Sequence, residues 1–375
     1  MISPKFFLDT LKKLEINFFT GVPDSSLKNF CAFLLDNTYK KEHIIAANEG
    51  NAIALAAGHY LATGNSGLVY MQNSGEGNAM DPLVSLMDKE VYNIPVLLLI
   101  GWRGQPGKYD EPQHKKQGRI TLSFLEILRI KYKILPENES ELETLLKNAK
   151  NYMKETKEPF ALIAKSSIFE EYKIKNKIKD NFELNREEAI RLIINSLEDR
   201  DIVVSTTGKA TRELFEYREF LKQGHEKDFL TIGSMGHSSS IALGIALEKK
   251  ERNVYCLDGD GALLMHMGSI AIIGQKSPEN FKHILLNNGC HESVGKQPTA
   301  GFNIDFVEIA KACGYKTLLK SENFSDLKEK LNVLKNSKCP GFLEIKLNKD
   351  SRKDLGRPTK TPIENKEDFI GFLKD

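Results

Sequence analysis

The chain has 375 residues, with 53 basic and 51 acidic side chains spread along its length and a formal net charge of +2. This length suffices for two domains of ordinary size, each with its own core, and the balanced charge lacks the electrostatic footprint of a nucleic-acid binder. The balanced charge favours a small-molecule partner. The five cysteines lack metal-ligand spacing, so we expect reduced thiols in a cytoplasmic protein. The longest apolar stretch, IPVLLLIGW, is too short to cross a bilayer, so we expect no membrane contact.

Along the chain, short apolar runs alternate with amphipathic stretches, which is the pattern of strand and helix units around a parallel sheet. In the first half the predicted strands are Ile16–Thr20, His43–Ala46, Gly67–Met71, Pro95–Ile100 and Phe160–Lys165. In the second half they are Asp201–Ser205, Asn253–Leu257, His283–Leu286 and Gly341–Leu347, and SSSIALGIALEKK is a predicted helix. The expected fold class is therefore α/β, with two doubly wound parallel sheets.

A polar, lysine-rich segment, SSIFEEYKIKNKIKDNFELNREEA, separates the two halves. We predict a first domain at residues 1–167, a linker at 168–184 and a second domain with a C-terminal tail at 185–375. The halves also end alike, with EPFALIAKSS in the first and CPGFLEIKLN in the second, each a proline before an apolar strand. This similarity indicates two related α/β domains without a third between them.

Two turns in the second half contain the residue types of a metal and phosphate site. Asp260 lies in a Gly-Asp-Gly turn after the predicted strand Asn253–Leu257, and a helix-periodic segment begins at Ala262. After twenty-five intervening residues, Asn287 and Asn288 follow the next predicted strand, so they should emerge at the same edge of the sheet. The glycines and the helix N-terminus suit a diphosphate, and a carboxylate, an amide oxygen and a backbone carbonyl suit Mg²⁺.

Two other interpretations of these turns are weaker. Gly, Asp and Asn form ordinary turns, which is the simpler interpretation of either element alone, but the spacing of the two favours a site. A nicotinamide site is disfavoured because neither GDGALLMHMG nor GEGNAM completes the G-x-G-x-x-G pattern after a strand.

The segment from Gly259 to Glu292 resembles the GDG–NN motif of thiamine-diphosphate-dependent enzymes. The resemblance implies Mg²⁺ ligands at Asp260, Asn288 and the main-chain carbonyl of Cys290. It also implies cofactor contacts within the motif at Gly259, Asp260, Gly261, Ala262, Asn288, His291 and Glu292.

The resemblance further implies a glutamate that bonds the aminopyrimidine ring of the cofactor and activates it. HIIAANEGNAIALAAGHYLATG offers Glu49 for this role, just after a predicted strand and at the start of an alanine-rich helix. We expect its carboxyl to be desolvated, with a raised pKa, so that it can exchange a proton with the ring. Taken alone, Glu49 would be an ordinary acid in the first turn of a helix.

Three more turns resemble cofactor-contacting segments of these enzymes. In FLTIGSMGHSSS, Met235 occupies the position of the apolar residue that holds the cofactor bent, whereas in isolation it would be an ordinary core methionine. STTGKATREL resembles a diphosphate-contacting turn, although a helix cap uses the same residue types. Together with MQNSG, these segments assign cofactor contacts to Asn73, Ser74, Thr206, Thr207, Gly208, Gly233, Ser234 and Met235.

The two-domain layout resembles the phosphonopyruvate and sulfopyruvate decarboxylases, whose substrates are pyruvates with an anionic group on the third carbon. FFTGVPDSSLKNF, MQNSGEGNAMDPL and LLNNGCHESVGKQPT carry this resemblance, and GWRGQPGKYDEPQHKKQGRIT and RKDLGRPTKTPIENK favour the phosphonate. The implied activity is decarboxylation of 3-phosphonopyruvate to phosphonoacetaldehyde, a step of phosphonate biosynthesis of the 2-aminoethylphosphonate type, with thiamine diphosphate and Mg²⁺. Sulfopyruvate decarboxylation is the alternative, and a non-catalytic thiamine-diphosphate-binding regulatory protein is the alternative from another class.

Basic and polar side chains must recognise such a substrate and move its protons. The resemblance implies proton handling by Asp24 and His114, although a lone histidine also serves as a loop hydrogen-bonding residue. The substrate-binding candidates are Asp24, Ser25, Arg103, Lys115, Arg352 and Arg357, and which of the basic ones converge is not decided by the sequence. Since Glu49 and Asp260 lie in different domains, the resemblance implies at least a homodimer with active sites at the subunit interface.

Overall fold

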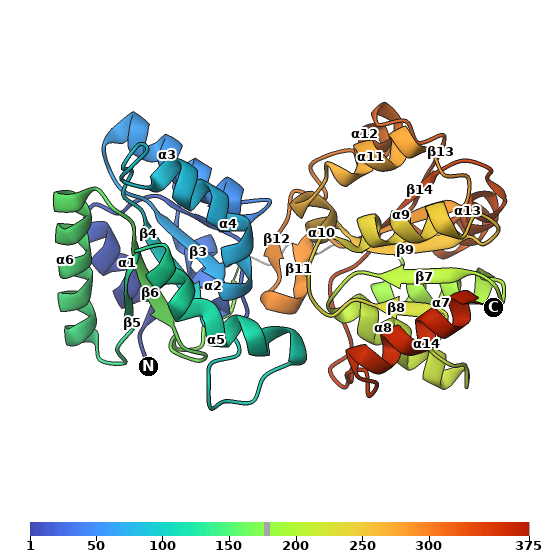
Figure 1. Cartoon of the computed structure of the whole chain (residues 1–375), viewed down its shortest axis with the longest axis horizontal. Coiled ribbons are helices and arrows are strands. Elements are labelled where there is room, and N and C mark those ends of the chain that lie inside the picture. The colour runs from blue at the N-terminus through green and yellow to red at the C-terminus, as the bar shows by residue number, and fades with distance from the viewer. Residues whose placement is uncertain (176–180, 375) are drawn as a thin grey trace. The chain divides into compact units, whose positions relative to one another are not determined.

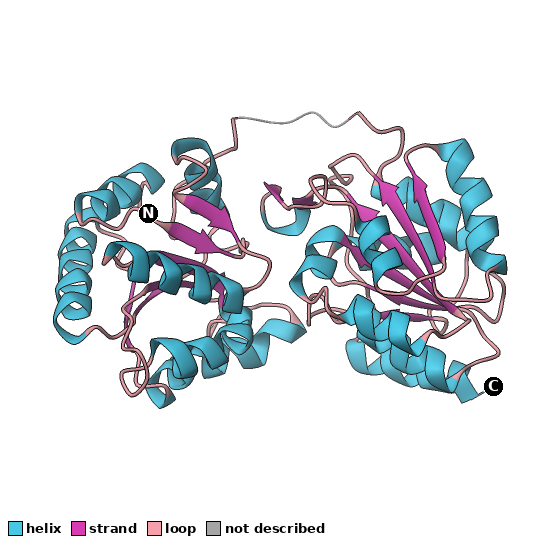
Figure 2. Ribbon diagram, turned by 90° about the horizontal axis from the view of Figure 1, so that it is seen from above, coloured by secondary structure: helices cyan, strands magenta, loops and turns pink. Residues whose placement is uncertain are grey.

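The computed structural model describes residues 1–175 and 181–374, which form two compact units (Figure 1). The first unit contains residues 1–175 and 294–297, and the second contains residues 181–293 and 298–374. Residues 176–180 of the predicted linker 168–184 lie outside the described residues. Each unit is built on a six-stranded sheet with helices on both faces (Figure 2), which confirms the expected α/β fold class.

The sheet of the first unit is parallel throughout, in the order β2-β1-β3-β4-β6-β5. Its strands are β1 (Phe19–Gly21), β2 (His43–Ile45), β3 (Leu68–Gln72), β4 (Leu97–Gly101), β5 (Lys131–Ile134) and β6 (Phe160–Ala164). The central strands are apolar on both faces because helices cover both faces. In β3, Leu68 and Tyr70 join one core, while Val69 and Met71 join the other.

Helices α1, α2 and α6 line the first of these two cores, and helices α3, α4 and α5 line the second. Their bounds are α1 (Pro4–Lys13), α2 (Lys28–Asn37), α3 (Glu49–Thr63), α4 (Glu76–Pro82), α5 (Pro112–Ile127) and α6 (Glu139–Thr156), with the short turns η1 (Asn73–Gly75) and η2 (Leu83–Met87) around α4. In this arrangement the turns after β2, β3 and β4 carry Glu49, Asn73 and Arg103 at the carboxyl edge of the sheet.

The sheet of the second unit is also parallel, in the order β13-β14-β10-β9-β7-β8. Its strands are β7 (Ile202–Ser205), β8 (Asp228–Leu230), β9 (Val254–Gly259), β10 (Phe281–Asn287), β13 (Thr317–Ser321) and β14 (Gly341–Lys346). A separate two-stranded sheet pairs β11 (Cys290–His291) with β12 (Gln297–Pro298). The short turn η3 (Glu292–Val294) lies between them in the chain.

Two cores flank this second sheet as well. Helices α7, α8 and α13 line one core, and helices α9, α10, α11, α12 and α14 line the other. Their bounds are α7 (Arg186–Ser196), α8 (Lys209–Phe220), α9 (Ser238–Glu248), α10 (Asp260–Met265), α11 (Ser269–Lys276), α12 (Phe306–Ala312), α13 (Phe324–Asn336) and α14 (Pro362–Lys374). The side chains of β9 alternate between the cores, with Tyr255 and Leu257 on one side and Val254 and Cys256 on the other.

The predicted strands all coincide with observed strands to within three residues at either end. The short strands β11 and β12 were not predicted, and neither were β5, β8 and β13 of the six-stranded sheets. These last three all lie at an edge of their sheet. An edge strand is covered on fewer sides, so it lacks the continuous apolar run of a central strand. The sequence of β5, Lys131–Ile134, alternates lysine with apolar residues and is mostly exposed.

The five cysteines form no disulfide bond. Cys31, Cys256 and Cys290 are buried, and Cys313 and Cys339 are half-buried.

Among the described helices, none combines the length and the apolar character that a membrane crossing requires.

Candidate active site

The strand register of the second unit brings the two predicted turns to one edge. Gly259, the last residue of β9, pairs with Leu286 in β10, so Asp260 and Asn287 leave the sheet side by side. Asp260 is then the first residue of α10. The Gly-Asp-Gly turn and the asparagine pair therefore share the carboxyl edge at which ligands bind in open α/β sheets.

The Asp260 side chain is a buried carboxylate, 2% exposed, that accepts a hydrogen bond from Thr299 Oγ1. Burial raises its pKa to about 6, and hydrogen bonds from Thr299 and main-chain amides partly offset this effect. The groups that stabilise the carboxylate most are neutral hydrogen-bond donors. A buried carboxylate with such partners fits a site for a divalent metal ion.

The two asparagines have different hydrogen-bond partners. Asn287 Nδ2 donates to Gly301 O at 2.8 Å and to Glu344 Oε1 at 2.7 Å, and Asn287 Oδ1 accepts from Gly289 N at 3.1 Å. Asn288 Nδ2 donates to Glu292 Oε2 at 2.9 Å, and its Oδ1 accepts from Cys290 N at 3.2 Å. Since a carbonyl oxygen has two lone pairs and each asparagine oxygen accepts one hydrogen bond, both oxygens retain a lone pair for a ligand, that of Asn288 among them.

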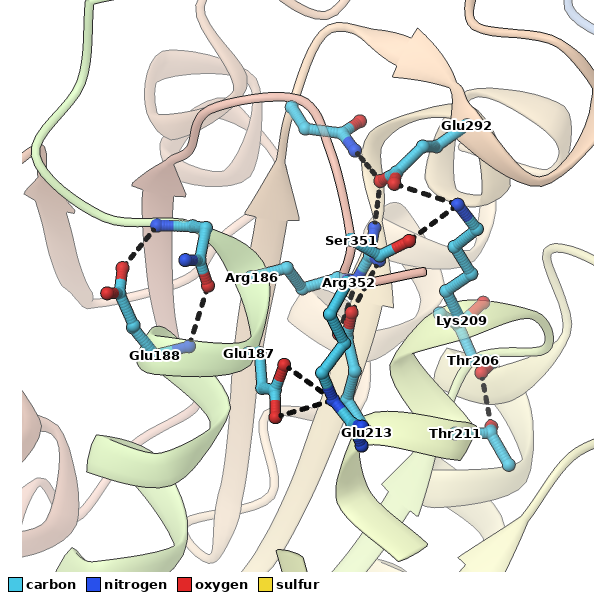
Figure 3. Close-up of polar contacts among 12 residues, drawn as sticks. Arg186, Glu187, Glu188, Thr206, Lys209, Thr211, Glu213, Glu292, Ser351 and Arg352 are labelled. Carbon is cyan, nitrogen blue, oxygen red and sulfur yellow. Dashed lines mark hydrogen bonds and ion pairs between the residues drawn. The ribbon is translucent and has the colours of Figure 1, made fainter. Parts of the chain in front are cut away.

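Glu292 belongs to a buried charge network (Figure 3). Its Oε2 accepts from Arg186 Nη1 at 2.6 Å and its Oε1 accepts from Lys209 Nζ at 3.0 Å. Arg186 also makes two bonds to Glu213, at 2.7 and 2.8 Å, and Lys209 bonds Ser351 Oγ at 2.7 Å. Burial alone would raise the pKa of Glu292, but Arg186 and Lys209 outweigh it and hold the pKa below its usual range.

Sequence reasoning missed Arg186, Glu213 and Lys209. Arg186 is the first residue of α7, in a capping box formed by Asn185 and Glu188, and nothing in its neighbourhood distinguishes it from a solvated arginine. Lys209 and Glu213 do lie within the recognised STTGKATREL segment, so their positions in that motif were the signal that could have found them.

The Thr206–Gly208 turn offers hydrogen-bond donors to an anion. Thr206 follows β7 and is 6% exposed, and its Oγ1 has no hydrogen-bond partner among the described residues. Gly208 has φ +105° and precedes α8, whose N-terminus has no side-chain cap, so the first amides of this helix are free to bind an anion. Thr207, between them, is half-buried.

The side chain of Met235 lies close to Gly261 of the Gly-Asp-Gly turn. A Cβ placed on Gly261 would lie 2.9 Å from the His291 ring and 3.4 Å from Met235 Cε, so glycine gives both side chains room above the turn. The half-buried Met235 follows Gly233 and Ser234, and Ser234 has φ +48°. Burial lowers the pKa of His291 to about 4, so its imidazole is neutral at physiological pH.

In the first unit, Glu49 begins α3 immediately after the N-cap residue Asn48. It is 5% exposed, and its Oε2 accepts from Asn78 Nδ2 at 2.8 Å. Burial raises its pKa, which the bond from Asn78 only partly offsets, and this confirms the expected desolvation. The carboxylate lies so close to Gly75 that a Cβ there would overlap it.

The neighbouring Asn73 is fully buried and braces the turn after β4. Its Nδ2 donates to Arg103 O at 2.8 Å and to Thr121 Oγ1 at 2.9 Å, and its Oδ1 accepts from Arg103 N at 3.1 Å. All its polar groups are thus occupied within the unit. Ser74 is exposed, and its hydroxyl donates to Gln72 Oε1 at 2.8 Å.

Three substrate-binding candidates of the first unit lie together. Asp24 is fully buried and accepts from Gln72 Nε2 at 2.5 Å and from Ser26 N at 3.0 Å, and burial raises its pKa. Arg103 Nη1 donates to Ser25 Oγ at 2.7 Å, while its other nitrogens bond Asp110. Arg103 is therefore partly neutralised, with one edge directed at Ser25.

The other candidates are spread more widely. His114 and Lys115 lie in the first turn of α5, with His114 half-buried and Lys115 exposed. Arg352 and Arg357 lie in the second unit, in the segment after β14, and Arg357 is exposed. The guanidinium of Arg352 is already surrounded by three carboxylates, those of Glu187, Glu216 and Asp354.

Comparison with known proteins agrees with this geometry. The family model of the thiamine pyrophosphate enzyme N-terminal TPP binding domain matches residues 4–124, and that of the C-terminal TPP binding domain matches residues 206–345. Phosphonopyruvate decarboxylases of Streptomyces viridochromogenes and Streptomyces hygroscopicus are 30% and 29% identical, each covering 100% of this chain and 95% of the relative. A sulfopyruvate decarboxylase of Methanosarcina acetivorans is 28% identical over 90% of this chain and 89% of its own. The chain therefore belongs to the thiamine-pyrophosphate-dependent decarboxylase family that includes phosphonopyruvate decarboxylase.

Proposed function

We propose that this protein decarboxylates 3-phosphonopyruvate to phosphonoacetaldehyde and CO₂, with thiamine diphosphate and Mg²⁺ as cofactors. The observation that carries the proposal is the similarity to two phosphonopyruvate decarboxylases over the full length of the chain. Within the site, it is supported by the buried Asp260 carboxylate, whose main hydrogen-bonding partners are neutral groups. When bound, the thiazolium ring of the cofactor supplies an electron sink for the bond that breaks.

We assign the cofactor contacts in the second unit, taken as the diphosphate-binding domain (185–375), as follows. Asp260, the Asn288 amide oxygen and the Cys290 carbonyl would hold Mg²⁺. The amides of Gly261 and Ala262 and the Thr206–Gly208 turn would hold the diphosphate, an assignment supported by the unpartnered Thr206 hydroxyl and the uncapped start of α8. Met235 would set the cofactor's conformation by steric contact.

The first unit, taken as the pyrimidine-binding domain (1–167), would supply the proton chemistry. Glu49 would hold a proton against the pyrimidine ring, and its raised pKa favours the protonated form that this exchange requires. Asp24, also buried with a raised pKa, would hold a proton near the substrate. The Arg103 guanidinium and the Ser25 hydroxyl would bind one of its anionic groups.

We infer that the working enzyme is at least a homodimer. Glu49 and Asp260 belong to different compact units, so a partner subunit can supply one of them to each active site. Cross-complementation tests this inference: mixing inactive Glu49→Gln subunits with inactive Asp260→Ala subunits should restore part of the activity. A mixture that stays inactive after subunit exchange has been demonstrated would contradict it.

The substrate assignment has sulfopyruvate as its alternative, because a sulfopyruvate decarboxylase is also related over most of the chain. The test is CO₂ release from phosphonopyruvate and from sulfopyruvate at matched concentration, with thiamine diphosphate and Mg²⁺ present. We expect the phosphonate to be the faster substrate. Faster turnover of the sulfonate would replace the assignment, and no turnover of either would favour the non-catalytic alternative.

A further inference from the structure

The side-chain amide of Asn288 is anchored by a carboxylate at its nitrogen end. Nδ2 donates to Glu292 Oε2 at 2.9 Å, and both side chains are buried. The two ends of an amide have nearly the same shape, so hydrogen bonds decide which end faces which side. A carboxylate accepts hydrogen bonds and donates none, so Glu292 can hold only the nitrogen end of Asn288.

Glu292 is itself fixed in place. Arg186 and Lys209 bind its two oxygens at 2.6 and 3.0 Å, and the Glu292 side chain is 3% exposed. Arg186 in turn donates two hydrogen bonds to the carboxylate of Glu213. A chain of contacts therefore leads from Glu213 in α8, through Arg186 at the start of α7 and Glu292, to Asn288, the residue that follows β10.

We propose that Glu292 is a positioning residue for the divalent cation, which fixes the Asn288 amide so that its oxygen, and not its nitrogen, is presented to Mg²⁺. The inference rests on the proposed role of Asn288 as a ligand. A flipped amide would direct N–H groups at the cation and remove one of its ligands. Glu292 thus acts through Asn288, whereas the motif resemblance had implied a direct contact with the cofactor.

The first test compares the Mg²⁺ concentration that half-saturates thiamine diphosphate binding, measured by calorimetry without substrate. Glu292→Ala removes the acceptor and should raise this concentration roughly tenfold or more, as the loss of an outer-sphere partner typically does. Glu292→Gln keeps a carbonyl oxygen for Asn288, so its value should stay much closer to that of the parent protein. An unchanged value in folded Glu292→Ala would overturn the proposal.

Asp228→Ala is the matched control, because it also removes a buried carboxylate from a buried arginine, Arg218, but touches neither asparagine. It should lower the melting temperature of the cofactor-free protein and leave the Mg²⁺ dependence unchanged. A comparable loss of Mg²⁺ affinity in this control would show that any broken core ion pair has the effect, and would refute a specific role for Glu292.

The second test changes the ligand and does not depend on Glu292→Ala folding. Asn288→Asp cannot donate to Glu292 and sets two carboxylates against each other, so it should weaken Mg²⁺ binding although carboxylates are good Mg²⁺ ligands. Adding Glu292→Gln to this variant supplies an N–H donor to the new aspartate, so the double variant should bind Mg²⁺ more tightly than Asn288→Asp alone. In the parent protein the same Glu292→Gln change should weaken Mg²⁺ binding slightly. The same effect in both backgrounds, or no binding by the double variant, would overturn the proposal.

These outcomes are separable from failure of the proposed function. If the parent protein binds no thiamine diphosphate at any Mg²⁺ concentration, the cofactor assignment itself is wrong. If the parent binds it and the Glu292 variants match the parent, only the positioning role is wrong.

Discussion

The carboxylate of Asp24 fills the space beside the Cα of Gly101 where any larger residue would place its Cβ. Gly101 is the last residue of β4, and Asp24 lies in the loop after β1. A buried acid and a strand glycine, distant in the sequence, thus depend on each other. The pair explains why position 101 is a glycine, while hydrogen bonds from Gln72 and Ser26 hold Asp24 in place.

Gly101→Ala is therefore expected to destabilise the protein by about 1–3 kcal/mol, because the new methyl group must displace Asp24 or the strand. Denaturant titration monitored by circular dichroism measures this change in the free energy of unfolding. Gly77→Ala in α4 is the control, since a Cβ there meets nothing within 4 Å, and it should be neutral or stabilising. Equal stability of the two variants would show that the strand adapts without cost.

Glu49→Gln is expected to lower the rate of decarboxylation by about 100-fold or more while thiamine diphosphate still binds, because the amide keeps the shape but cannot transfer the proton. Single-turnover kinetics at saturating cofactor measures this loss. Glu76→Gln is the control, as a second buried glutamate of the same unit. A variant at position 49 with the parent's rate would remove Glu49 from the mechanism.

The stability of the protein is expected to fall as the pH rises, through Glu76. This carboxyl is 4% exposed, its Oε1 has no hydrogen-bond partner among the described residues, and burial raises its pKa to about 9. In the unfolded chain the group ionises near the ordinary glutamate pKa of 4.5, so between the two values the unfolded state binds fewer protons than the folded state. Each pH unit in that window then costs up to about 1.4 kcal/mol of stability.

Glu76→Gln should remove this cost. The variant is expected to be more stable than the parent at pH 8, with the difference shrinking toward pH 4, where the glutamate is protonated in both states. Urea titrations of both proteins across this range measure the difference. A constant difference at every pH would mean that the effect of the substitution is steric.

Thiamine diphosphate with Mg²⁺ is expected to raise the melting temperature of the parent protein. Asp260→Ala is expected to abolish the rise, because Mg²⁺ then loses the carboxylate proposed to bind it. Differential scanning fluorimetry with and without both ligands measures the shift. Asp199→Ala, which changes a fully exposed aspartate of the same unit, should keep the full shift. A shift that survives in Asp260→Ala would relocate the metal site.

The sequence was enough to predict the elements that a local residue pattern determines. The central strands β3 and β10 are buried on both faces and contain the apolar runs LVYM and ILL, so they were predictable, whereas the edge strand β5 was not. The arrival of Asp260 and Asn287 at one edge followed from parallel topology alone. The raised pKa of Glu49 followed from its expected desolvation.

The remainder of the site depends on tertiary contacts that leave no trace in a local pattern. Arg186 and Glu213 are charged residues at ordinary helix positions, and only folding brings them to Glu292. The different partners of Asn287 and Asn288 could not be predicted either, because two identical neighbours differ only in what surrounds them. The pairing of Arg352 with three carboxylates could not be read from a basic tail segment either.

The bonds around the asparagine pair also bear on chemical ageing. An asparagine followed by glycine deamidates when the glycine nitrogen attacks the side-chain amide, and Asn288 is followed by Gly289. Here that nitrogen donates to Asn287 at 3.1 Å, and Glu292 holds the amide it would have to attack. We therefore expect the folded chain to slow the conversion of Asn288, the proposed Mg²⁺ ligand, to aspartate. A partly unfolded preparation loses that protection, and its damage would fall on Asn288 first.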